Sequence, residues 1–243
     1  MKNFEIKSLE WDTDFFGVNS AALYIYSDLS DEDRAFILKE IEKFEFVTIK
    51  DEMYLESNGH WITGELHAKL VDVNMQFERG LKEMQPYKEE QKQVMIEECM
   101  EINEQMIKIA EDSFIYSRFY NDAHIGKEKG KKVYGNWVRN AFNVPGKVFA
   151  FIKAGEEVQG FVLFSICNKI LTIELICVDK RARRRHSGTA LINEVIKYAE
   201  FHQVSFVQVG TQIQNIQAIN FYFKNGFKLK KTIATYHLWV EKL

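Results

Sequence analysis

In the first 80 residues, apolar side chains recur with the spacing of a helix in some segments and with the alternation of a strand in others. Residues 30–44, SDEDRAFILKEIEKF, place apolar side chains at 37, 38, 41 and 44 after a serine and a run of acids, which is typical of a capped amphipathic helix. A strand-like run, FEFVTIK, follows at 44–50, and residues 70–77, LVDVNMQF, alternate apolar and polar side chains with the period of a half-buried strand. We therefore expect residues 1–80 to form a small α/β module.

A charged stretch separates this module from the rest of the chain. Residues 78–93 contain Gly80 and Pro86 and show little apolar periodicity. Because glycine and proline interrupt regular structure, this composition predicts a connection rather than a packed element. We place a linker at residues 81–94 and a second, larger domain at residues 95–243.

The second domain has its own order of patterns. A helix-biased stretch around 100–142 leads into apolar runs with short polar connections, at 147–155, 158–166 and 170–178. Such runs favour a meander of antiparallel strands. Helical spacing returns between Leu191 and Phe201, and the remaining patterns predict a strand, a helix and a closing strand, at 204–209, 215–226 and 232–240.

Composition places the chain among ordinary folded proteins. Hydrophobic residues make up 46% and aromatic residues 14%, which predicts an aromatic-rich core and argues against disorder. Charges interrupt the apolar runs near the N-terminus, and nowhere do roughly 18 apolar residues occur together, so we expect a soluble protein that is neither exported nor inserted in a membrane. The formal net charge of -3 argues against nucleic acid as a partner.

The cysteines and histidines do not indicate a metal centre. Cys99, Cys167 and Cys177 are odd in number and lack C-x-x-C spacing, which supports neither a disulfide framework nor a zinc site. None of the histidines pairs with another at metal-ligand spacing. We therefore expect no bound metal, and a reducing, cytoplasmic location.

A dense basic run lies between the third apolar run of the second domain and the helix that follows it. In VDKRARRRHSGTAL, residues 178–191, the cationic side chains are Lys180, Arg181, Arg183, Arg184 and Arg185. The first turn of a helix presents unpaired N–H groups and the positive end of the helix dipole, both of which favour an anion. Gly188 would let a phosphate approach the backbone closely. We predict a phosphate cradle; the alternatives are a solvated charged run and a nucleic-acid patch.

This run resembles the acetyl-CoA-binding motif of the GNAT N-acetyltransferase superfamily, in which a strand ending in Val leads to an R-x-x-G-x-G/A loop at a helix start. Alignment on the helical segment GTALI places Arg183 at the basic position and Gly188 at the second glycine, while His186 stands in place of the first glycine. A second frame, on Arg185, Gly188 and Ala190, matches the letters but fits the helical pattern less well. The resemblance implies that the basic run binds the pyrophosphate of coenzyme A.

The later part of the chain extends this resemblance. Residues 211–228, TQIQNIQAINFYFKNGFK, carry Asn, Ala, Tyr and Gly-Phe at the spacing of a later superfamily motif, and the element order of residues 95–243 is that of its fold. The implied fold is α/β, with a mixed, largely antiparallel central sheet preceded by the smaller N-terminal module. The implied acetyl-CoA-binding residues are Ile176, Cys177, Val178, Arg183, Arg184, Arg185, His186, Ser187, Gly188, Thr189, Asn215, Ala218 and Tyr222.

Three segments resemble the TDP-fucosamine acetyltransferase group within this superfamily. They are LEWDTDFFG at 9–17, LVDVNMQF at 70–77 and SRFYND at 117–122. The resemblance implies acetyl transfer from acetyl-CoA to the amine of a nucleotide-linked amino sugar, a dTDP-4-amino-4,6-dideoxyhexose. The first segment supplies candidate substrate-binding residues, which are Asp14, Phe15 and Phe16, with Trp11 and Asp12. The alternative is that this segment is plain core with a turn.

Acetyl transfer to an amine needs an acid for the departing thiolate and a base for the amine. Tyr222 matches the superfamily's general acid, and a phenol of reference pKa about 10 can protonate a thiolate of similar basicity. Its alternative role is that of a packed aromatic. Glu174 is the candidate base, because alternation in LTIELICV points it away from Ile173 and Leu175. The alternatives are an exposed strand carboxylate and ordered water as the base.

The strand that carries Glu174 ends with two further candidates. The backbone amides near Cys177 and Val178 would, as the resemblance implies, polarise the thioester carbonyl and hold the pantetheine arm. We expect Cys177 to pack in the core rather than to act as a nucleophile. Rival functions are an N-acetyltransferase for another small-molecule amine, such as an amino acid or a polyamine, and a non-catalytic acyl-CoA-binding module. The sequence leaves open the amine, the acyl length and the oligomeric state, a homodimer included.

Overall fold

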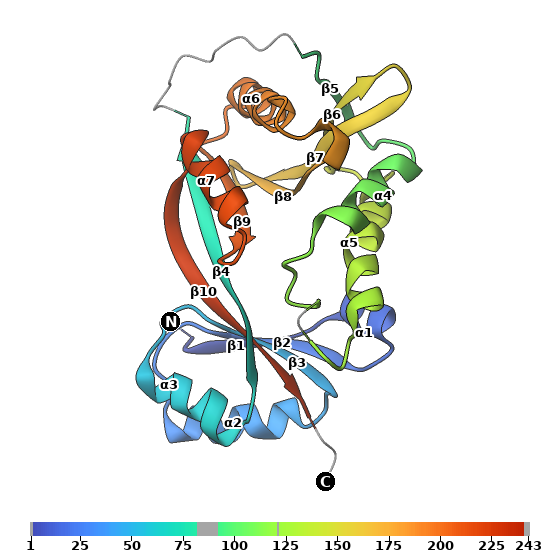
Figure 1. Ribbon diagram of the computed structural model, residues 1–243. Coiled ribbons are helices and arrows are strands. Elements are labelled where there is room, and N and C mark those ends of the chain that lie inside the picture. Colours follow the sequence, from blue (N-terminus) through green and yellow to red (C-terminus); the bar gives the residue numbers. More distant parts are fainter. Residues whose placement is uncertain (1, 82–91, 121, 241–243) are drawn as a thin grey trace. The chain divides into compact units, whose positions relative to one another are not determined.

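The computed structural model describes residues 2–81, 92–120 and 122–240 (Figure 1). The chain forms two compact units, and neither is one continuous stretch of sequence. Unit 1 consists of Met1–Met75, Ser117–Gly126 and Lys231–Leu243, and unit 2 consists of Gln76–Tyr116 and Lys127–Lys230. The predicted linker at 81–94 lies mostly outside the described residues, so its boundaries stay a prediction.

Unit 1 contains both helices and strands, and the predicted module at 1–80 as a separate domain stays a prediction. Its strands follow the order β1-β2-β3-β10-β4, in which β1 and β10 run antiparallel to their neighbours β2 and β3, and β2 runs parallel to β3. The elements that lie in or contribute to unit 1 are β1 (Phe4–Ser8), α1 (Glu10–Phe16), β2 (Ser20–Ile25), α2 (Asp31–Ile41), β3 (Phe46–Asp51), α3 (Glu56–His60), a π-helical turn η1 (Trp61–Glu65), β4 (Lys69–Gly80) and β10 (Lys228–Trp239).

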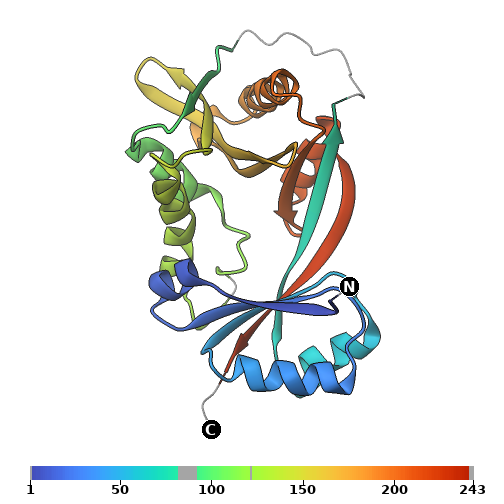
Figure 2. The same ribbon diagram turned by 180° about the vertical axis from the view of Figure 1, so that it is seen from behind.

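The predicted helix at 30–44 is confirmed as α2. The Ser30 hydroxyl accepts a hydrogen bond from the Asp33 N–H, and the Asp33 carboxylate accepts one from the Ser30 N–H, which makes a complete capping box. Ile37 and Ile41 of α2 are buried in an apolar core on one face of the unit 1 strands, together with residues of η1, β2, β3 and β10. Figure 2 shows α2 against these strands from behind.

The other face of the unit 1 strands, called the polar face below, carries buried polar side chains together with aromatic rings such as that of Phe46. Side chains alternate along a strand, so Val47 and Ile49 enter the apolar core while Thr48 and Lys50 point to the opposite face. The register pairs Thr48 with His237 of β10, and His237 is therefore on the polar face too. Thr48 and His237 are both buried.

Unit 2 has a mixed, largely antiparallel sheet, which confirms the predicted fold class. Its strand order is β10-β4-β9-β8-β7-β6-β5; β5 to β8 pair antiparallel, and β8 pairs parallel with β9. Besides parts of β4 and β10, its elements are β5 (Met95–Glu98), α4 (Glu104–Ser113), α5 (Lys127–Ala141), β6 (Val148–Ala154), β7 (Glu157–Cys167), β8 (Ile170–Val178), a 3-10 turn η2 (Lys180–Ala182), α6 (Ser187–Phe201), β9 (Phe206–Gln212) and α7 (Ile216–Lys224).

The core of unit 2 is rich in phenylalanine, as the composition predicts. Five consecutive residues of β6, Val148–Ile152, are buried, so both faces of the sheet are covered there. Helices α4 and α6 both pack against β7 and β8. Among the described residues, no helix is long and apolar enough to cross a membrane.

Candidate functional site

The junction between β8 and α6 is tied down by short-range hydrogen bonds. The Asp179 carboxylate accepts the Arg181 N–H at 2.8 Å and so caps η2. The Arg183 Nε donates to the Val178 carbonyl at 3.1 Å, which links the loop back to the end of the strand. The buried Ser187 Oγ accepts a hydrogen bond from Lys92 Nζ at 2.7 Å, at the first residue of α6. The loop is therefore held where the first-turn amides of α6 are exposed to a ligand.

Two residues of this loop adopt the left-handed conformation. Arg184 has φ of 59° and His186 has φ of 61°. Glycine adopts this conformation freely, whereas a residue with a Cβ pays about 1–2 kcal/mol. The backbone at His186 thus has a conformation that glycine adopts without strain, and the sequence frame on Arg183, His186 and Gly188 stays a prediction.

The cationic side chains of the basic run divide into two groups. Arg181 is committed within the protein, because its Nε lies 3.1 Å from Asp179 and its Nη1 lies 3.8 Å from Glu157. Arg184 and Arg185 are exposed, and neither makes a hydrogen bond or ion pair with another described residue. These two guanidinium groups are therefore available to an anion, as is the exposed Lys180, while Arg183 is bonded only through its Nε within the described residues.

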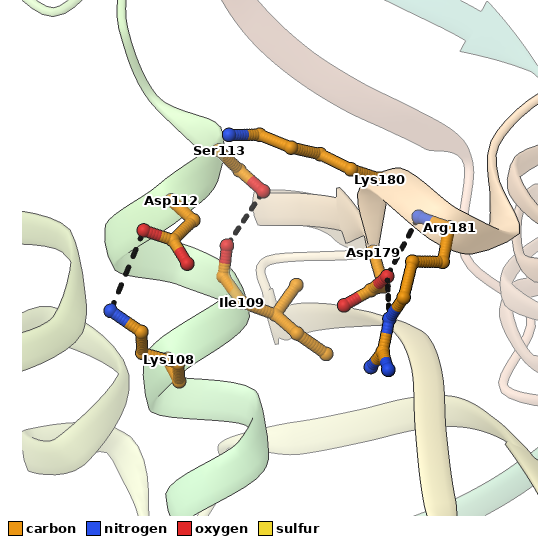
Figure 3. A pocket seen from close by; sticks show the side chains of 7 residues that line it. All are labelled: Lys108, Ile109, Asp112, Ser113, Asp179, Lys180 and Arg181. Carbon is orange, nitrogen blue, oxygen red and sulfur yellow. Dashed lines mark hydrogen bonds and ion pairs between the residues drawn. The ribbon is translucent and has the colours of Figure 1, made fainter.

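A pocket of about 240 Å³ lies between α4 and the beginning of the basic run (Figure 3). The α4 side brings Lys108, which pairs with Asp112 at 3.5 Å, and Ser113, whose hydroxyl donates to the Ile109 carbonyl. The other side is formed by Asp179, Lys180 and Arg181. The sequence patterns did not single out the α4 residues, because they read only as a helix-biased stretch.

Gly188 has a packing role besides the predicted one, which is to let a phosphate approach the backbone closely. A Cβ at this position would lie 3.1 and 3.2 Å from ring carbons of Phe221. Such a contact is tight, so the glycine allows the start of α6 to pack closely against α7. Thr189, the next residue, is half-buried.

The end of β8 leaves part of its backbone outside the sheet register. Leu163 of β7 pairs with Leu175 and Phe164 pairs with Ile173, so Glu174 is the extra residue of a β-bulge. The parallel register with β9 covers only Ile170–Ile173 of β8. The following segment, which includes the predicted Ile176, Cys177 and Val178, is therefore outside the register with β9 and pairs with β7 alone, and its role in binding acetyl-CoA stays a prediction.

Tyr222 and Cys177 come together from α7 and β8. The Tyr222 side chain is 3% exposed and packs among the rings of Phe77, Phe221 and Phe227. Burial, with a smaller contribution from the neighbouring Cys177, raises the pKa of the Tyr222 phenol, and burial also raises the pKa of the Cys177 thiol. Both groups are neutral at physiological pH, as a proton donor and a core cysteine are expected to be.

Asn215 and Ala218 form the N-terminal cap of α7. The Asn215 Oδ1 accepts the Ala218 N–H at 3.2 Å, which satisfies an otherwise unpaired helix amide. These two residues thereby fix the start of the helix that carries Tyr222.

Glu174 is engaged inside unit 2 rather than free. Its Oε1 is ion-paired with Lys147 Nζ and accepts a hydrogen bond from Ser165 Oγ at 2.7 Å. Its Oε2 accepts from Trp137 Nε1 at 3.3 Å. The role of Glu174 as a base stays a prediction, and this network supports the ordered-water alternative.

In unit 1, α1 turns one of its two candidate acids inward and leaves the other exposed. Asp14 is exposed, whereas Asp12 and Phe16, four residues apart on one helix face, are buried. Phe15 stacks on Trp11 with ring centroids 5.0 Å apart. The substrate-binding role of Asp14, Phe15 and Phe16, with Trp11 and Asp12, stays a prediction.

The segment SRFYND lies in unit 1 and contributes to a buried polar network there. The Asp122 Oδ2 lies 2.6 Å from His237 Nδ1, and Arg118 Nη1 lies 2.6 Å from His237 Nε2 and 2.8 Å from Thr48 Oγ1. Arginine only donates, so His237 accepts at Nε2 and donates its Nδ1–H to Asp122. Burial lowers the pKa of His237 to about 4, in agreement with a neutral ring. Sequence patterns could not find this network, because its members are far apart in the chain.

No metal-binding group emerges from the parts of the chain that the structure describes. Among those residues, no three or more histidine, cysteine, aspartate or glutamate side chains are arranged to hold a metal ion.

Comparisons with known proteins agree with this geometry. The model of the acetyltransferase (GNAT) family matches residues 103–227. A spore coat polysaccharide biosynthesis protein of Bacillus subtilis, SpsD, is 27% identical over 139 residues, which cover 57% of this chain and 48% of the relative. An uncharacterized N-acetyltransferase of Methanocaldococcus jannaschii is 35% identical over 134 residues, which cover 52% of this chain and 58% of the relative. The matches thus span about half the length of these curated relatives.

A solved structure of similar fold covers the whole chain. The GCN5-related N-acetyltransferase from Kribbella flavida superimposes with a TM-score of 0.62 over 100% of this chain and 90% of that chain, at 11% sequence identity. At this level of identity the likeness concerns the fold alone.

Proposed function

Since this chain belongs to the acetyltransferase (GNAT) family, we propose that it transfers an acetyl group from acetyl-CoA to the amine of a nucleotide-linked amino sugar, a dTDP-4-amino-4,6-dideoxyhexose. The observation that carries the acetyl-CoA part is the loop before α6, in which Arg184 and His186 are left-handed and two guanidinium groups remain available. That loop has the chemistry of a pyrophosphate site at a helix N-terminus.

In the proposed reaction, residues of β8 stabilise the carbonyl oxygen and Tyr222 of α7 protonates the thiolate. Acetyl-CoA supplies the acetyl group as a thioester. The backbone N–H groups near Cys177 and Val178 stabilise the carbonyl oxygen as the amine nitrogen bonds to the acetyl carbon. The nitrogen of the tetrahedral intermediate loses its extra proton to water; when the carbon–sulfur bond breaks, Tyr222 gives its proton to the thiolate and the amide is left. The phenol is then restored by a proton from solvent.

The amino-sugar part of the proposal has separate support. The segments at 9–17, 70–77 and 117–122 resemble the TDP-fucosamine acetyltransferase group. The Bacillus subtilis relative is named for spore coat polysaccharide biosynthesis, which favours a sugar-containing substrate over an amino acid or a polyamine. Binding energy from a remote nucleotide can position the amine for attack, which a small free amine cannot exploit.

An acceptor comparison tests this proposal. Purified protein is incubated with acetyl-CoA and, in turn, dTDP-4-amino-4,6-dideoxygalactose, the free 4-amino sugar, spermidine and a mixture of amino acids, with thiol release and product mass as readouts. We expect kcat/KM for the nucleotide sugar to exceed that for the free sugar at least a hundredfold, or about 2.7 kcal/mol. Equal activity on the free sugar, or preference for spermidine or an amino acid, would refute the sugar-nucleotide substrate. Binding of acetyl-CoA without thiol release from any amine would refute catalysis.

A further inference from the structure

A lysine from outside the basic run reaches the start of α6. Lys92 lies shortly before β5, and its Nζ donates a hydrogen bond at 2.7 Å to the Oγ of Ser187, the first residue of α6. Ser187 is 2% exposed, and its hydroxyl in turn donates to the Ala182 carbonyl at 3.4 Å. The buried hydroxyl therefore has a fixed orientation and holds the Lys92 ammonium at the N-terminal end of the helix.

The position of the Lys92 ammonium is electrostatically unfavourable in the protein alone. Helix α6 has 15 residues, and its aligned peptide dipoles place partial positive charge at its first turn. An anion is stabilised at this end of a helix, whereas lysine side chains are favoured near the other end. Lys92 therefore adds positive charge where the helix already supplies it.

No carboxylate of the described residues offsets this charge. Lys92 is half-buried, and within the described ranges it makes no ion pair and no hydrogen bond besides that to Ser187. An ammonium has three N–H groups, so this bond occupies only one of them. Arg184 and Arg185, which precede Ser187 in the same loop, are likewise without a described partner. Positive charge from two separate parts of the chain thus gathers at the start of α6.

The donors at the start of α6 indicate the kind of ligand that fits them. Exposed first-turn N–H groups, an ammonium and two guanidinium groups can all donate to phosphate oxygens. A diphosphate supplies several such oxygens and more than one negative charge. Lysine binds phosphate as a compact point charge with rotatable donors, so Lys92 can keep its bond to Ser187 and donate to a phosphate as well. A single carboxylate would leave most of this positive charge without a counter-charge.

We infer that Lys92 is a phosphate-binding residue of the acetyl-CoA site, and that its ammonium donates to the pyrophosphate at the first turn of α6. This inference rests on the proposed function and names one further residue of that site. The acetyl-CoA-binding residues indicated by the sequence all lie between Ile176 and Tyr222, whereas Lys92 comes from the segment before β5. Ser187 acts as a positioning residue, because its hydroxyl holds the ammonium in place.

Binding of coenzyme A to the full chain tests the role of Lys92 without depending on the amine substrate. Coenzyme A is titrated calorimetrically into each variant at fixed ionic strength. Lys92→Met removes the charge and keeps an unbranched side chain, and we expect it to raise the Kd about tenfold, as loss of a charge-assisted hydrogen bond does. Lys92→Arg keeps the charge and should stay within about threefold of the wild type. The matched control is Lys169→Met, an exposed lysine in the turn before β8, which should bind coenzyme A as the wild type does.

Dephospho-coenzyme A, which lacks the 3′-phosphate, identifies the phosphate that Lys92 binds. If the ammonium donates to the pyrophosphate, Lys92→Met should weaken the binding of coenzyme A and of dephospho-coenzyme A by the same factor. A loss with coenzyme A that disappears with dephospho-coenzyme A would place Lys92 at the 3′-phosphate and overturn the pyrophosphate assignment.

A double-mutant cycle and steady-state kinetics separate binding from a structural role. Ser187→Ala removes the acceptor that positions Lys92, so its effect on the Kd and that of Lys92→Met should not add in the double variant. Lys92→Met should raise the KM for acetyl-CoA and keep kcat within about twofold, which a general loss of folded protein would not do. Wild-type affinity in Lys92→Met, or equal losses in Lys92→Met and Lys92→Arg, would overturn the role of Lys92 and leave the proposed function standing. A wild-type protein that does not bind coenzyme A would overturn both.

Discussion

The residue that departs from the expected motif, His186, has a left-handed backbone conformation, which glycine adopts without strain. Its φ of 61° lies where a Cβ crowds the following carbonyl. The chain therefore keeps the loop geometry at a local cost in strain, because the fixed strand end and helix start on either side determine the path.

This strain can be measured by comparing two substitutions at one position. His186→Gly should be more stable than His186→Ala by about 1 kcal/mol, since both remove the imidazole and only glycine adopts the left-handed region without cost. The measurement is urea denaturation of both variants with equal m values. Equal stability of the two would mean that the loop is not held in this conformation in solution.

Tyr222 is the residue whose chemistry can be separated from its packing. Tyr222→Phe keeps the ring contacts with Phe77, Phe221 and Phe227 and removes only the hydroxyl. We expect kcat to fall about a hundredfold with little change in the KM for acetyl-CoA, as loss of a general acid does. The measurement is initial-rate kinetics with the amine found to be the substrate.

A second tyrosine of unit 2 serves as the control. Tyr198 lies on α6, and its hydroxyl is bonded to Glu98 on β5. Tyr198→Phe should retain kcat within about twofold. An unchanged kcat in Tyr222→Phe, or an acetylated Cys177 detected by mass spectrometry, would contradict direct transfer with Tyr222 as the acid.

At the scale of elements, the basic run between β8 and α6 contains two kinds of cation. Some are bonded within the protein and hold the loop, and others remain available to a ligand. Arg181 is paired with Asp179 and Glu157, and Arg183 is bonded to the end of β8. Arg184 and Arg185 make no such contacts within the described residues. A dense basic run is thus partly structural, which the composition of the run does not reveal.

This separation predicts different effects on acetyl-CoA binding. The double variant Arg184→Ala/Arg185→Ala should raise the KM for acetyl-CoA at least tenfold, or about 1.4 kcal/mol. Arg181→Ala should raise it less than about threefold, because its charge is already compensated within the protein. Steady-state kinetics at fixed ionic strength measure both. If Arg181→Ala raised the KM for acetyl-CoA more than the double variant does, the phosphates would bind beside Arg181 rather than beside Arg184 and Arg185.

The helix-biased stretch around 100–142 is the element that the sequence pattern described least well. It contains two helices, α4 and α5, separated by Ser117–Gly126, which belongs to unit 1. Ser117, Phe119 and Asp122 of that segment are buried among unit 1 residues. Propensity alone does not predict this break, because tertiary contacts override a helical tendency at such positions.

On the scale of the whole molecule, the division into units predicts where acetyl-CoA acts. The residues proposed to bind it all lie in unit 2, so acetyl-CoA should slow amide hydrogen exchange at the end of β8 and in the first turn of α6. Exchange in β1, β2 and β3 of unit 1 should remain as in the free protein. Hydrogen-exchange mass spectrometry with and without acetyl-CoA measures both, and protection confined to unit 1 would contradict the proposed site.

The sequence by itself determined the elements and the chemistry of the loop before α6. Apolar spacing, the Ser30 cap and the Gly188 junction are local features, and a period of 2 or 3.6 residues acts over a few neighbours whatever the rest of the chain does. That is why β6 to β10, α2 and α7 could be predicted, whereas β5 was not.

Only the tertiary structure decided which side chains meet. Glu174 faces the side that alternation predicts, yet its ion pair with Lys147, 27 residues away, commits the carboxylate. Asp122 and His237 are 115 residues apart and form a buried pair, and Asp12 rather than Asp14 is buried. A sequence pattern gives the direction in which a side chain points, but its partners come from strands and helices that folding brings together from distant parts of the chain.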